Sequence, residues 1–226
     1  MKKTLLITLI AAFGLSYSAW AGPCPVGDTL ADYISLFPST GCTVGGINFN
    51  GFSYSNPSFG GATAPPASGV DVTPVPSGFG NEVGLEFTAA WLVSSGGGED
   101  SAITFTVSCA PDCTDAELIT VGGADGTGSA SVAEGSTKPP DLNLFSANSG
   151  SDIATFAPVG SFTVNKDIGV VAGTDGDAHM SFVYNLFSTS STPPPPIPEP
   201  SLLLLCSGLV ALVPLARRKL RRKVSA

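Results

Sequence analysis

Positive charge is scarce in the middle of this 226-residue chain. Of its ten lysines and arginines, only Lys138 and Lys166 lie between positions 22 and 196, whereas seventeen of the eighteen acidic residues lie there. A surface this acidic repels nucleic acids and anionic lipids, because both carry dense negative charge. The charge pattern therefore excludes nucleic acid as a partner and favours solubility or loose association with cations.

Residue patterns for catalysis are also missing. The only histidine, His179, would need a serine on a strained elbow to form a catalytic triad, and the chain has no Gly-x-Ser-x-Gly sequence. Glu99 and Asp100 are predicted on a loop tip, which makes them poor candidates for a pair of hydrolase carboxylates. We therefore predict no catalytic residue and no cofactor, and a hydrolase is only a remote alternative.

One short acidic sequence is a weak candidate for a cation site. Asp175 and Asp177 flank Gly176 and could offer oxygen ligands to Ca²⁺. The other acidic positions of a calcium-binding loop are missing, so an acidic turn is the preferred interpretation. We assign no metal to the chain.

The N-terminus has the three parts of a secretory signal peptide, residues 1–21. Lys2 and Lys3 form the basic start and residues 4–15 the apolar centre, and Ala19 and Ala21 are the small residues that signal peptidase requires. We expect export by the general secretion machinery and cleavage after Ala21.

The C-terminus reads as a membrane-embedded segment. A proline-rich linker, residues 190–197, is followed by Pro198, Glu199 and Pro200, and then by an apolar stretch at 201–216. As a helix this stretch is about 24 Å long, slightly short of a typical membrane span. A basic cluster follows and would stay in the cytoplasm by the positive-inside rule. It consists of Arg217, Arg218, Lys219, Arg221, Arg222 and Lys223.

This order of Pro-Glu-Pro, short apolar helix and basic end, residues 198–223, resembles the PEP-CTERM sorting signal of Gram-negative bacteria. The same tail is sometimes labelled an ice-binding protein C-terminal domain, a label that describes only the tail. The resemblance implies membrane anchoring through the C-terminal helix and processing by an exosortase near Pro198, Glu199 and Pro200. It also implies a place at the cell surface or in the extracellular matrix, in association with exopolysaccharide and biofilm.

Residues 22–189 form the predicted ectodomain, in which short runs alternate between apolar and polar residues. Residues 83–93 and 103–109 are the clearest runs, and a glycine-rich segment at 94–100 between them predicts a hairpin loop. Many short strands separated by turn residues predict an all-β fold, an antiparallel, jelly-roll-like β-sandwich with a separate C-terminal transmembrane helix. We expect Phe87, Trp91, Phe105 and Phe182 to point into its core.

Two local features depart from this alternation. In residues 47–55 the apolar phase shifts at Gly51, which predicts a β-bulge. Residues 28–36 alone have helical spacing, with Asp28 as the expected N-cap.

Four cysteines lie in the ectodomain, where export predicts disulfide bonds. We favour the two local pairings, Cys24–Cys42 and Cys109–Cys113. A zinc site is a poor alternative in an oxidising compartment, because the chain has one histidine.

The sequence favours an exported, non-catalytic surface or matrix protein. The alternative is a carbohydrate-binding or Ca²⁺-dependent binding module, which exposed Trp or Tyr side chains beside acidic turns would support. Trp20 leaves with the signal peptide and Trp91 is expected in the core, and both points weaken this alternative.

Overall fold

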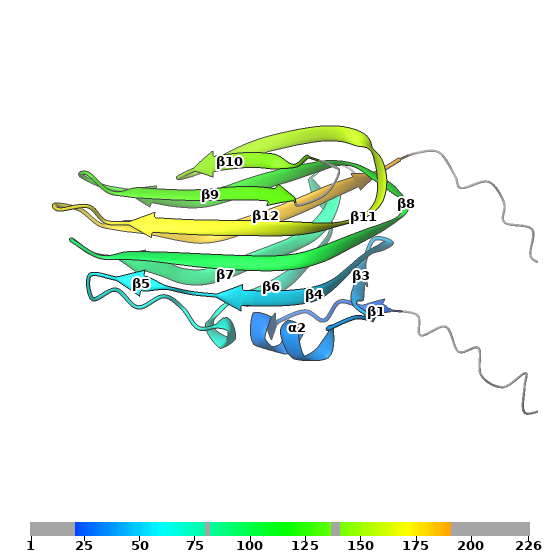
Figure 1. Cartoon of the computed structure of the whole chain (residues 1–226), viewed down its shortest axis with the longest axis horizontal. Coiled ribbons are helices and arrows are strands. Elements are labelled where there is room, and N and C mark those ends of the chain that lie inside the picture. The colour runs from blue at the N-terminus through cyan, green and yellow to red at the C-terminus, as the bar shows by residue number, and fades with distance from the viewer. Residues whose placement is uncertain (1–20, 80–81, 137–140, 191–226) are drawn as a thin grey trace, which may run out of the picture. The chain divides into compact units, whose positions relative to one another are not determined.

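Alternating apolar and polar residues make this chain a β-strand protein, because alternation turns one apolar face of each strand toward a core. The computed structural model describes residues 21–79, 82–136 and 141–190 (Figure 1). Its strands are β1 (Gly22–Pro23), β2 (Asp28–Thr29), β3 (Cys42–Val44), β4 (Ile47–Ser55), β5 (Ser58–Phe59), β6 (Asp71–Phe79), β7 (Glu82–Val93), β8 (Gly98–Ala124), β9 (Ser129–Ser136), β10 (Asn143–Ala147), β11 (Gly150–Val171) and β12 (Ala178–Thr189). The described helices are α2 (Leu30–Leu36) and the 3-10 helix η1 (Ala67–Gly69).

The strands form two layers that face each other. The first layer has the order β1-β3-β4-β8-β11-β9-β10 and uses the N-terminal part of β8 and the C-terminal part of β11. The second layer has the order β2-β6-β7-β12-β8-β11 and uses the other parts of β8 and β11. Apart from the parallel pair β1–β3, the pairings of the described strands are antiparallel. The predicted all-β sandwich with a short N-terminal helix is confirmed.

Strands β8 and β11 belong to both layers because each bends at a corner. In β8 the bend lies between Cys109 and Cys113, which are joined by the predicted disulfide, and contains Pro111, which cannot donate to a β-ladder. In β11 the register shifts between Thr155 and Ser161, opposite this corner. The two layers are therefore continuous along one edge.

Large apolar side chains fill the space between the layers. The Phe87 and Phe105 rings lie 5.9 Å apart and the Phe49 and Phe187 rings 6.0 Å apart, and each pair joins the two layers. Trp91 is fully buried. The inward orientation predicted for Phe87, Trp91 and Phe105 is confirmed, and burying each contributes about 1.5–3 kcal/mol to stability.

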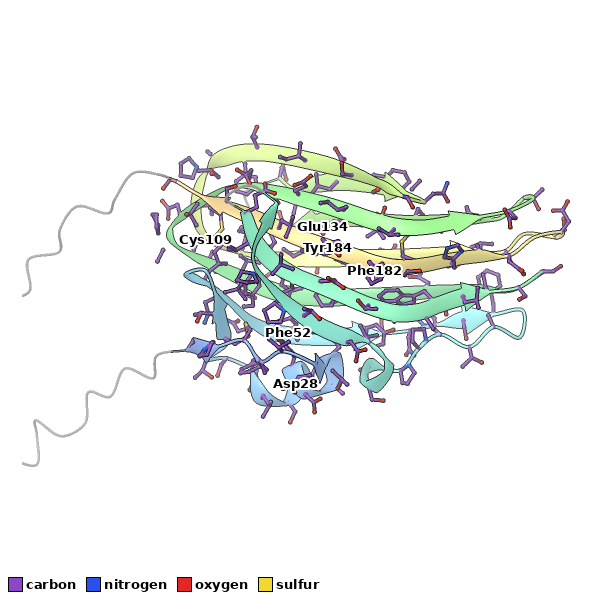
Figure 2. The ribbon with its side chains drawn as sticks, turned by 180° about the vertical axis from the view of Figure 1, so that it is seen from behind. Asp28, Phe52, Cys109, Glu134, Phe182 and Tyr184 are labelled. Carbon is purple, nitrogen blue, oxygen red and sulfur yellow. A yellow bond between two sulfur atoms is a disulfide. The ribbon has the colours of Figure 1, made fainter. Side chains whose placement is uncertain are left out.

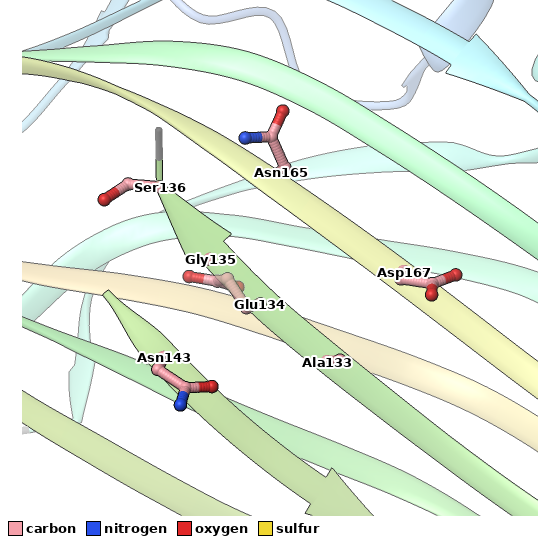
Figure 3. Close-up of a pocket in the computed structure, with 7 residues that line it drawn as sticks. All are labelled: Ala133, Glu134, Gly135, Ser136, Asn143, Asn165 and Asp167. Carbon is pink, nitrogen blue, oxygen red and sulfur yellow. The ribbon is translucent and has the colours of Figure 1, made fainter. Parts of the chain in front are cut away.

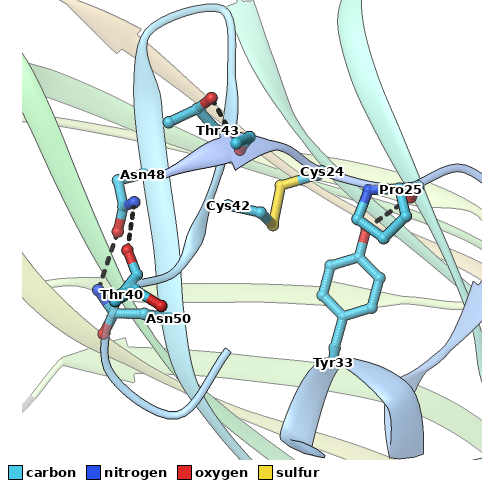
Figure 4. The surroundings of a disulfide bond; sticks show 9 residues. Cys24, Pro25, Tyr33, Thr40, Cys42, Thr43, Asn48 and Asn50 are labelled. Atoms are coloured by element: carbon cyan, nitrogen blue, oxygen red, sulfur yellow. Dashed lines mark hydrogen bonds between the residues drawn. A yellow bond between two sulfur atoms is a disulfide. The ribbon is translucent and has the colours of Figure 1, made fainter. Parts of the chain in front are cut away.

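A second disulfide fixes the N-terminal segment to the first layer (Figure 4). It joins Cys24 to Cys42 in β3, as predicted, and the Cys24 N–H donates to the Thr43 carbonyl at 3.0 Å. The Tyr33 hydroxyl of α2 donates to the Pro25 carbonyl at 2.8 Å. Helix and N-terminus are thereby tied to the same edge of the sandwich.

The predicted N-cap of this helix, Asp28, is wrong. Thr29 caps α2: its hydroxyl accepts the Asp32 N–H at 3.3 Å, and the Asp32 carboxylate accepts the Thr29 N–H at 3.0 Å. This reciprocal capping box satisfies two N–H groups that lack a partner within the helix. Asp28 lies instead in β2, opposite Val72 of β6.

Bulges set the phase of two strands. Gly51 adopts a φ of 66° where the β4–β8 register shifts, which confirms the bulge predicted there. A second register shift, in β12 between Met180 and Phe182, was not predicted. It reverses the alternation, so that Met180 points inward while Phe182 points outward and is 36% exposed. The predicted burial of Phe182 is therefore wrong.

The segment after β7 is a crossover and not the predicted hairpin. β7 pairs with β6 and β12 in the second layer, whereas the first part of β8 pairs with β4 and β11 in the first layer. The glycine-rich loop therefore carries the chain from one layer to the other. Glycine signals a change of direction, and it does not determine which strand the next one will pair with.

Residues 1–20 of the predicted signal peptide, the Pro-Glu-Pro motif and the transmembrane helix at 201–216 lie outside the described residues. Within the described part of the chain, no helix is long and apolar enough to cross a membrane.

Candidate functional site

The outer surface of the first layer carries a continuous array of small polar side chains, which we call the polar face. The array arises because every second residue of β4, β8, β11 and β10 points away from the core. Antiparallel register aligns these residues in rows across the layer. The polar face consists of Asn48, Asn50, Thr104, Thr106, Ser108, Asn143, Ser161, Thr163, Asn165 and Asp167.

Hydrogen bonds between neighbouring strands orient many of these side chains. The Ser108 and Ser161 hydroxyls lie 2.9 Å apart, and the Thr104 hydroxyl donates to the Asn165 side-chain oxygen at 3.2 Å. The second bond leaves the Asn165 amide nitrogen directed away from Thr104. Because side-chain amides both donate and accept, such a face can bind a ligand rich in hydroxyl groups.

A depression of about 310 Å³ lies at one end of the polar face (Figure 3). Asn165 and Asp167 of β11 lie on one side of it and Asn143 of β10 on the other, with the small residues Ala133 and Gly135 of β9 between them. Its lining residues are Ala133, Glu134, Gly135, Ser136, Asn143, Asn165 and Asp167. Small residues on the middle strand create the hollow, and longer polar residues on the flanking strands border it.

The carboxyl group of Asp167 titrates unusually. A hydrogen bond with the Asp100 carboxyl, together with burial and the Asp100 charge, raises the pKa of Asp167 to about 6. The two residues are diagonal neighbours, since Asp167 lies opposite Ala102 and Asp100 opposite Gly169. Below about pH 6 this carboxyl pair holds a proton that it can donate to a ligand, and above that pH it accepts hydrogen bonds.

An aromatic ring lies in the same cross-strand row as the depression. Phe145 of β10 is 58% exposed and lies opposite Ala133, which in turn lies opposite Asp167. An exposed ring beside amides and a carboxyl offers an apolar plane next to polar partners.

The outer surface of the second layer has a different character, with aromatic, aliphatic and acidic residues together. Phe182 and Tyr184 point outward from β12 (Figure 2), and burial followed by the Glu86 charge raises the pKa of Tyr184. Burial and a hydrogen bond with Glu117 raise the pKa of Glu82 to about 8. Within the described residues no group of three or more acidic, histidine or cysteine residues is arranged to hold a metal ion.

The residues considered as a cation site connect two turns. The Asp175 carboxylate accepts the Thr127 N–H at 3.1 Å and its hydroxyl at 2.8 Å, and the Asp177 carbonyl accepts the Asp125 N–H at 2.9 Å. These hydrogen bonds hold the two segments side by side. His179 is exposed in β12.

The predicted loop-tip position of Glu99 and Asp100 is wrong. Both lie in β8, where Asp100 is exposed and Glu99 points inward and is 1% exposed. The strand begins at Gly98, which pairs with Val171 of β11. One of the glycines that suggested a loop therefore belongs to the sheet.

Sequence reasoning did not find Asn143, Asn165 and Asp167. The sequence signal that pointed toward the polar face was the alternation in β8, which turns Thr104 and Thr106 away from the core. Bringing these threonines beside β11, β9 and β10 depends on pairings between segments far apart in sequence, which alternation does not specify.

Comparison with known proteins identifies no family. No protein-family profile matches the chain, and no curated protein matches it. Among solved structures, TmCBM61 in complex with β-1,4-galactotriose has a TM-score of 0.35 and 9% identity over 59% of this chain and 86% of that chain. A structure of carbohydrate-binding modules from the β-sandwich superfamily has a TM-score of 0.28 and 10% identity over 72% of this chain and 62% of that chain. The enzymatically active domain of bacteriophage CBA120 tailspike protein 4 has a TM-score of 0.27 and 14% identity, over 59% of this chain and 19% of that chain. TM-scores this low establish neither a shared family nor a shared ligand.

Proposed function

We propose that the ectodomain, residues 22–189, is a non-catalytic module that binds a neutral polysaccharide on the polar face. The observation that carries this proposal is the depression bordered by Asn143, Asn165 and Asp167, with Phe145 in the same row. It favours the binding module over a purely structural surface protein, because a structural face needs no such hollow.

The chemistry of the depression suits a sugar. Each sugar hydroxyl donates and accepts hydrogen bonds, and the amides of Asn143 and Asn165 can do both. The apolar side of a sugar ring can stack on the exposed Phe145 ring. The acidic surface disfavours a polyanion, so the preferred ligand is uncharged.

A polymer suits the polar face better than a single sugar. Beyond the depression, polar rows continue across β11 and β8 to Asn48 and Asn50 of β4. The Asn50 amide donates to the Asn48 side-chain oxygen at 2.9 Å, so these side chains too are oriented. A chain of sugars can therefore contact several strands in succession.

We further propose that the chain is exported and anchored through its C-terminal helix. Exosortase processing at Pro198, Glu199 and Pro200 would then deliver it to the cell surface or the extracellular matrix. The signal peptide, the tail sequence and the two disulfides support this route.

Binding to a panel of neutral polysaccharides and to native exopolysaccharide, by affinity electrophoresis and calorimetry, tests the proposal. Replacing Asn165 and Asp167 together by alanine should weaken binding at least tenfold, since each lost hydrogen bond contributes about 1 kcal/mol. Phe145→Ala should weaken it by a similar factor. Phe182→Ala, on the opposite outer surface, is the matched control and should bind like the wild type.

Two results would contradict the proposal. If the protein binds no polysaccharide in the panel, the proposed binding function is wrong. If Phe182→Ala abolishes binding while the variants in the depression do not, the ligand binds the outer surface of the second layer and not the polar face. Loss of binding with a chelator would instead support the Ca²⁺-dependent alternative.

A further inference from the structure

Three polar side chains meet inside the sandwich, where apolar packing is expected. The Lys166 ammonium nitrogen lies 2.6 Å from Oε2 of Glu134, and the Asn185 amide nitrogen donates to that same oxygen at 2.5 Å. None of the three is more than 2% exposed. Lys166 of β11 and Glu134 of β9 are cross-strand partners in the first layer, whereas Asn185 reaches Glu134 from β12 in the second.

Aliphatic residues surround this buried group. The strand partners of Asn185 are Leu85 and Leu118, Lys166 lies opposite Ile103, and Glu134 lies opposite Leu144. All four partners are buried. Well-packed apolar residues would stabilise this position at least as well as an ion pair, because desolvation of two charges offsets their attraction. Structural support alone is therefore a weak explanation for the three residues.

The surroundings disfavour the charged form of Lys166. Burial lowers the pKa of Lys166, and the nearby Glu134 carboxylate opposes this shift only in part. A proton passed from Lys166 to Glu134 gives a neutral amine and a neutral carboxylic acid, and the neutral amine is a nucleophile. The group that can react with this amine is the side-chain amide of Asn185, which donates a hydrogen bond to the same Glu134 oxygen as Lys166 does.

We propose that Lys166 and Asn185 form an intramolecular isopeptide bond, with Glu134 as the catalytic proton-transfer residue. The Lys166 nitrogen attacks the side-chain carbonyl carbon of Asn185 and a C–N bond forms. Protonated Glu134 donates to the departing amide nitrogen, the old C–N bond breaks and ammonia leaves. The attacking nitrogen returns its surplus proton to Glu134, which ends as a neutral acid.

The reaction is balanced in atoms and charge, and it needs only the three buried residues. Its reactants are an ammonium, a carboxylate and a primary amide, and its products are a secondary amide, a carboxylic acid and ammonia. Atoms and charge balance without any oxidant, reductant or external reactant. The reaction also removes a buried ion pair, which relieves the desolvation penalty of the two charges. The product joins β11 of one layer to β12 of the other by a bond that thiols cannot reduce.

Trypsin digestion of the full chain, reduced and held in denaturant, tests the proposal. Trypsin does not cut before proline, and Lys138 is followed by Pro139, so Lys166 is its one expected cleavage point between residues 22 and 189. The isopeptide bond should leave Lys166 uncut. The peptide that contains Lys166 and Asn185 should be lighter than its sequence by about 17 Da, the mass of ammonia.

Variants identify the participants. Asn185→Ala and Glu134→Gln should restore cleavage after Lys166 and the full peptide mass. Asn165→Ala is the matched control, because this residue adjoins Lys166 in sequence but faces outward, and it should keep the bond.

Cleavage of the wild-type chain after Lys166, with Asn185 unmodified, overturns the proposal whether or not any variant folds. A loss of ammonia with Lys166 still cleavable also overturns it, because the ammonia then comes from a succinimide at an asparagine, such as Asn50 before Gly51, and not from a cross-link. A bond that persists in folded Glu134→Gln removes Glu134 from the reaction.

Discussion

Replacing Glu99 by glutamine tests how the sandwich tolerates a buried carboxyl group. Glu99 is 1% exposed, and among the described residues neither of its carboxylate oxygens has a hydrogen-bond partner. Burial raises its pKa from an ordinary 4.5 to about 7. The folded state therefore binds this proton more tightly than the unfolded state does. The resulting stability is fully present below pH 4.5 and is lost as the pH rises through 7.

The size of the effect follows from the shift in pKa. At about 1.4 kcal/mol per pKa unit, and after a discount for solvent screening, the wild type should lose about 2 kcal/mol between pH 4.5 and pH 8.5 through Glu99. Glutamine has nearly the same shape and does not titrate. Glu99→Gln should therefore match the wild type at about pH 4, where both states are protonated, and exceed its free energy of unfolding by about 2 kcal/mol at pH 8.5.

Urea unfolding followed by Trp91 fluorescence measures this difference, because Trp91 is fully buried. The raised pKa values of Glu82 and Asp167 add a slope of the same sign, and it cancels when the two proteins are compared at each pH. Asp177→Asn, which replaces an exposed carboxylate, is the matched control and should follow the wild-type profile. A stability difference between Glu99→Gln and the wild type that does not change with pH would refute the reasoning.

Three further predictions concern the N-terminal segment and the tail. Thr29→Ala should lower the free energy of unfolding by about 1 kcal/mol through loss of the capping box, whereas Asp28→Ala should change it by less than about 0.5 kcal/mol in the same urea titration. Replacing Cys24 and Cys42 together by alanine should cost about 3 kcal/mol, seen as a lower thermal midpoint, and an unchanged midpoint would contradict a stabilising role. Replacing residues 198–200 by alanine should leave an uncleaved, membrane-retained form on immunoblots, and an unchanged mature mass would exclude processing there.

Much of the fold could be predicted because alternation is a local property. Residues 83–93 and 103–109 bury their apolar sides as expected, and both disulfides join the cysteines nearest in sequence. The layer to which each strand belongs is not local. β8 and β11 each serve both layers, and an alternating run does not show that its second half pairs with different neighbours.

The candidate site was predicted less well because it depends on register. Thr104 and Asn165 lie 61 positions apart in the sequence and yet hydrogen-bond across two strands. The depression also needs small residues at Ala133 and Gly135, between longer ones on β10 and β11. Small residues in a strand have no distinctive sequence pattern, and only the paired neighbours turn them into a hollow.

The buried group shows how one bulge can determine both surface and core. Lys166 is in phase with the buried Val164 and Ile168, so alternation alone places a lysine inside the sandwich and calls for an acidic partner. Unbroken alternation from Met180 would turn Phe182 inward and Asn185 outward, away from that lysine. The register shift after Met180 reverses both side chains, and so exposes Phe182 and brings Asn185 to Glu134. The same irregularity that makes the prediction for Phe182 wrong therefore assembles the three residues of the proposed cross-link.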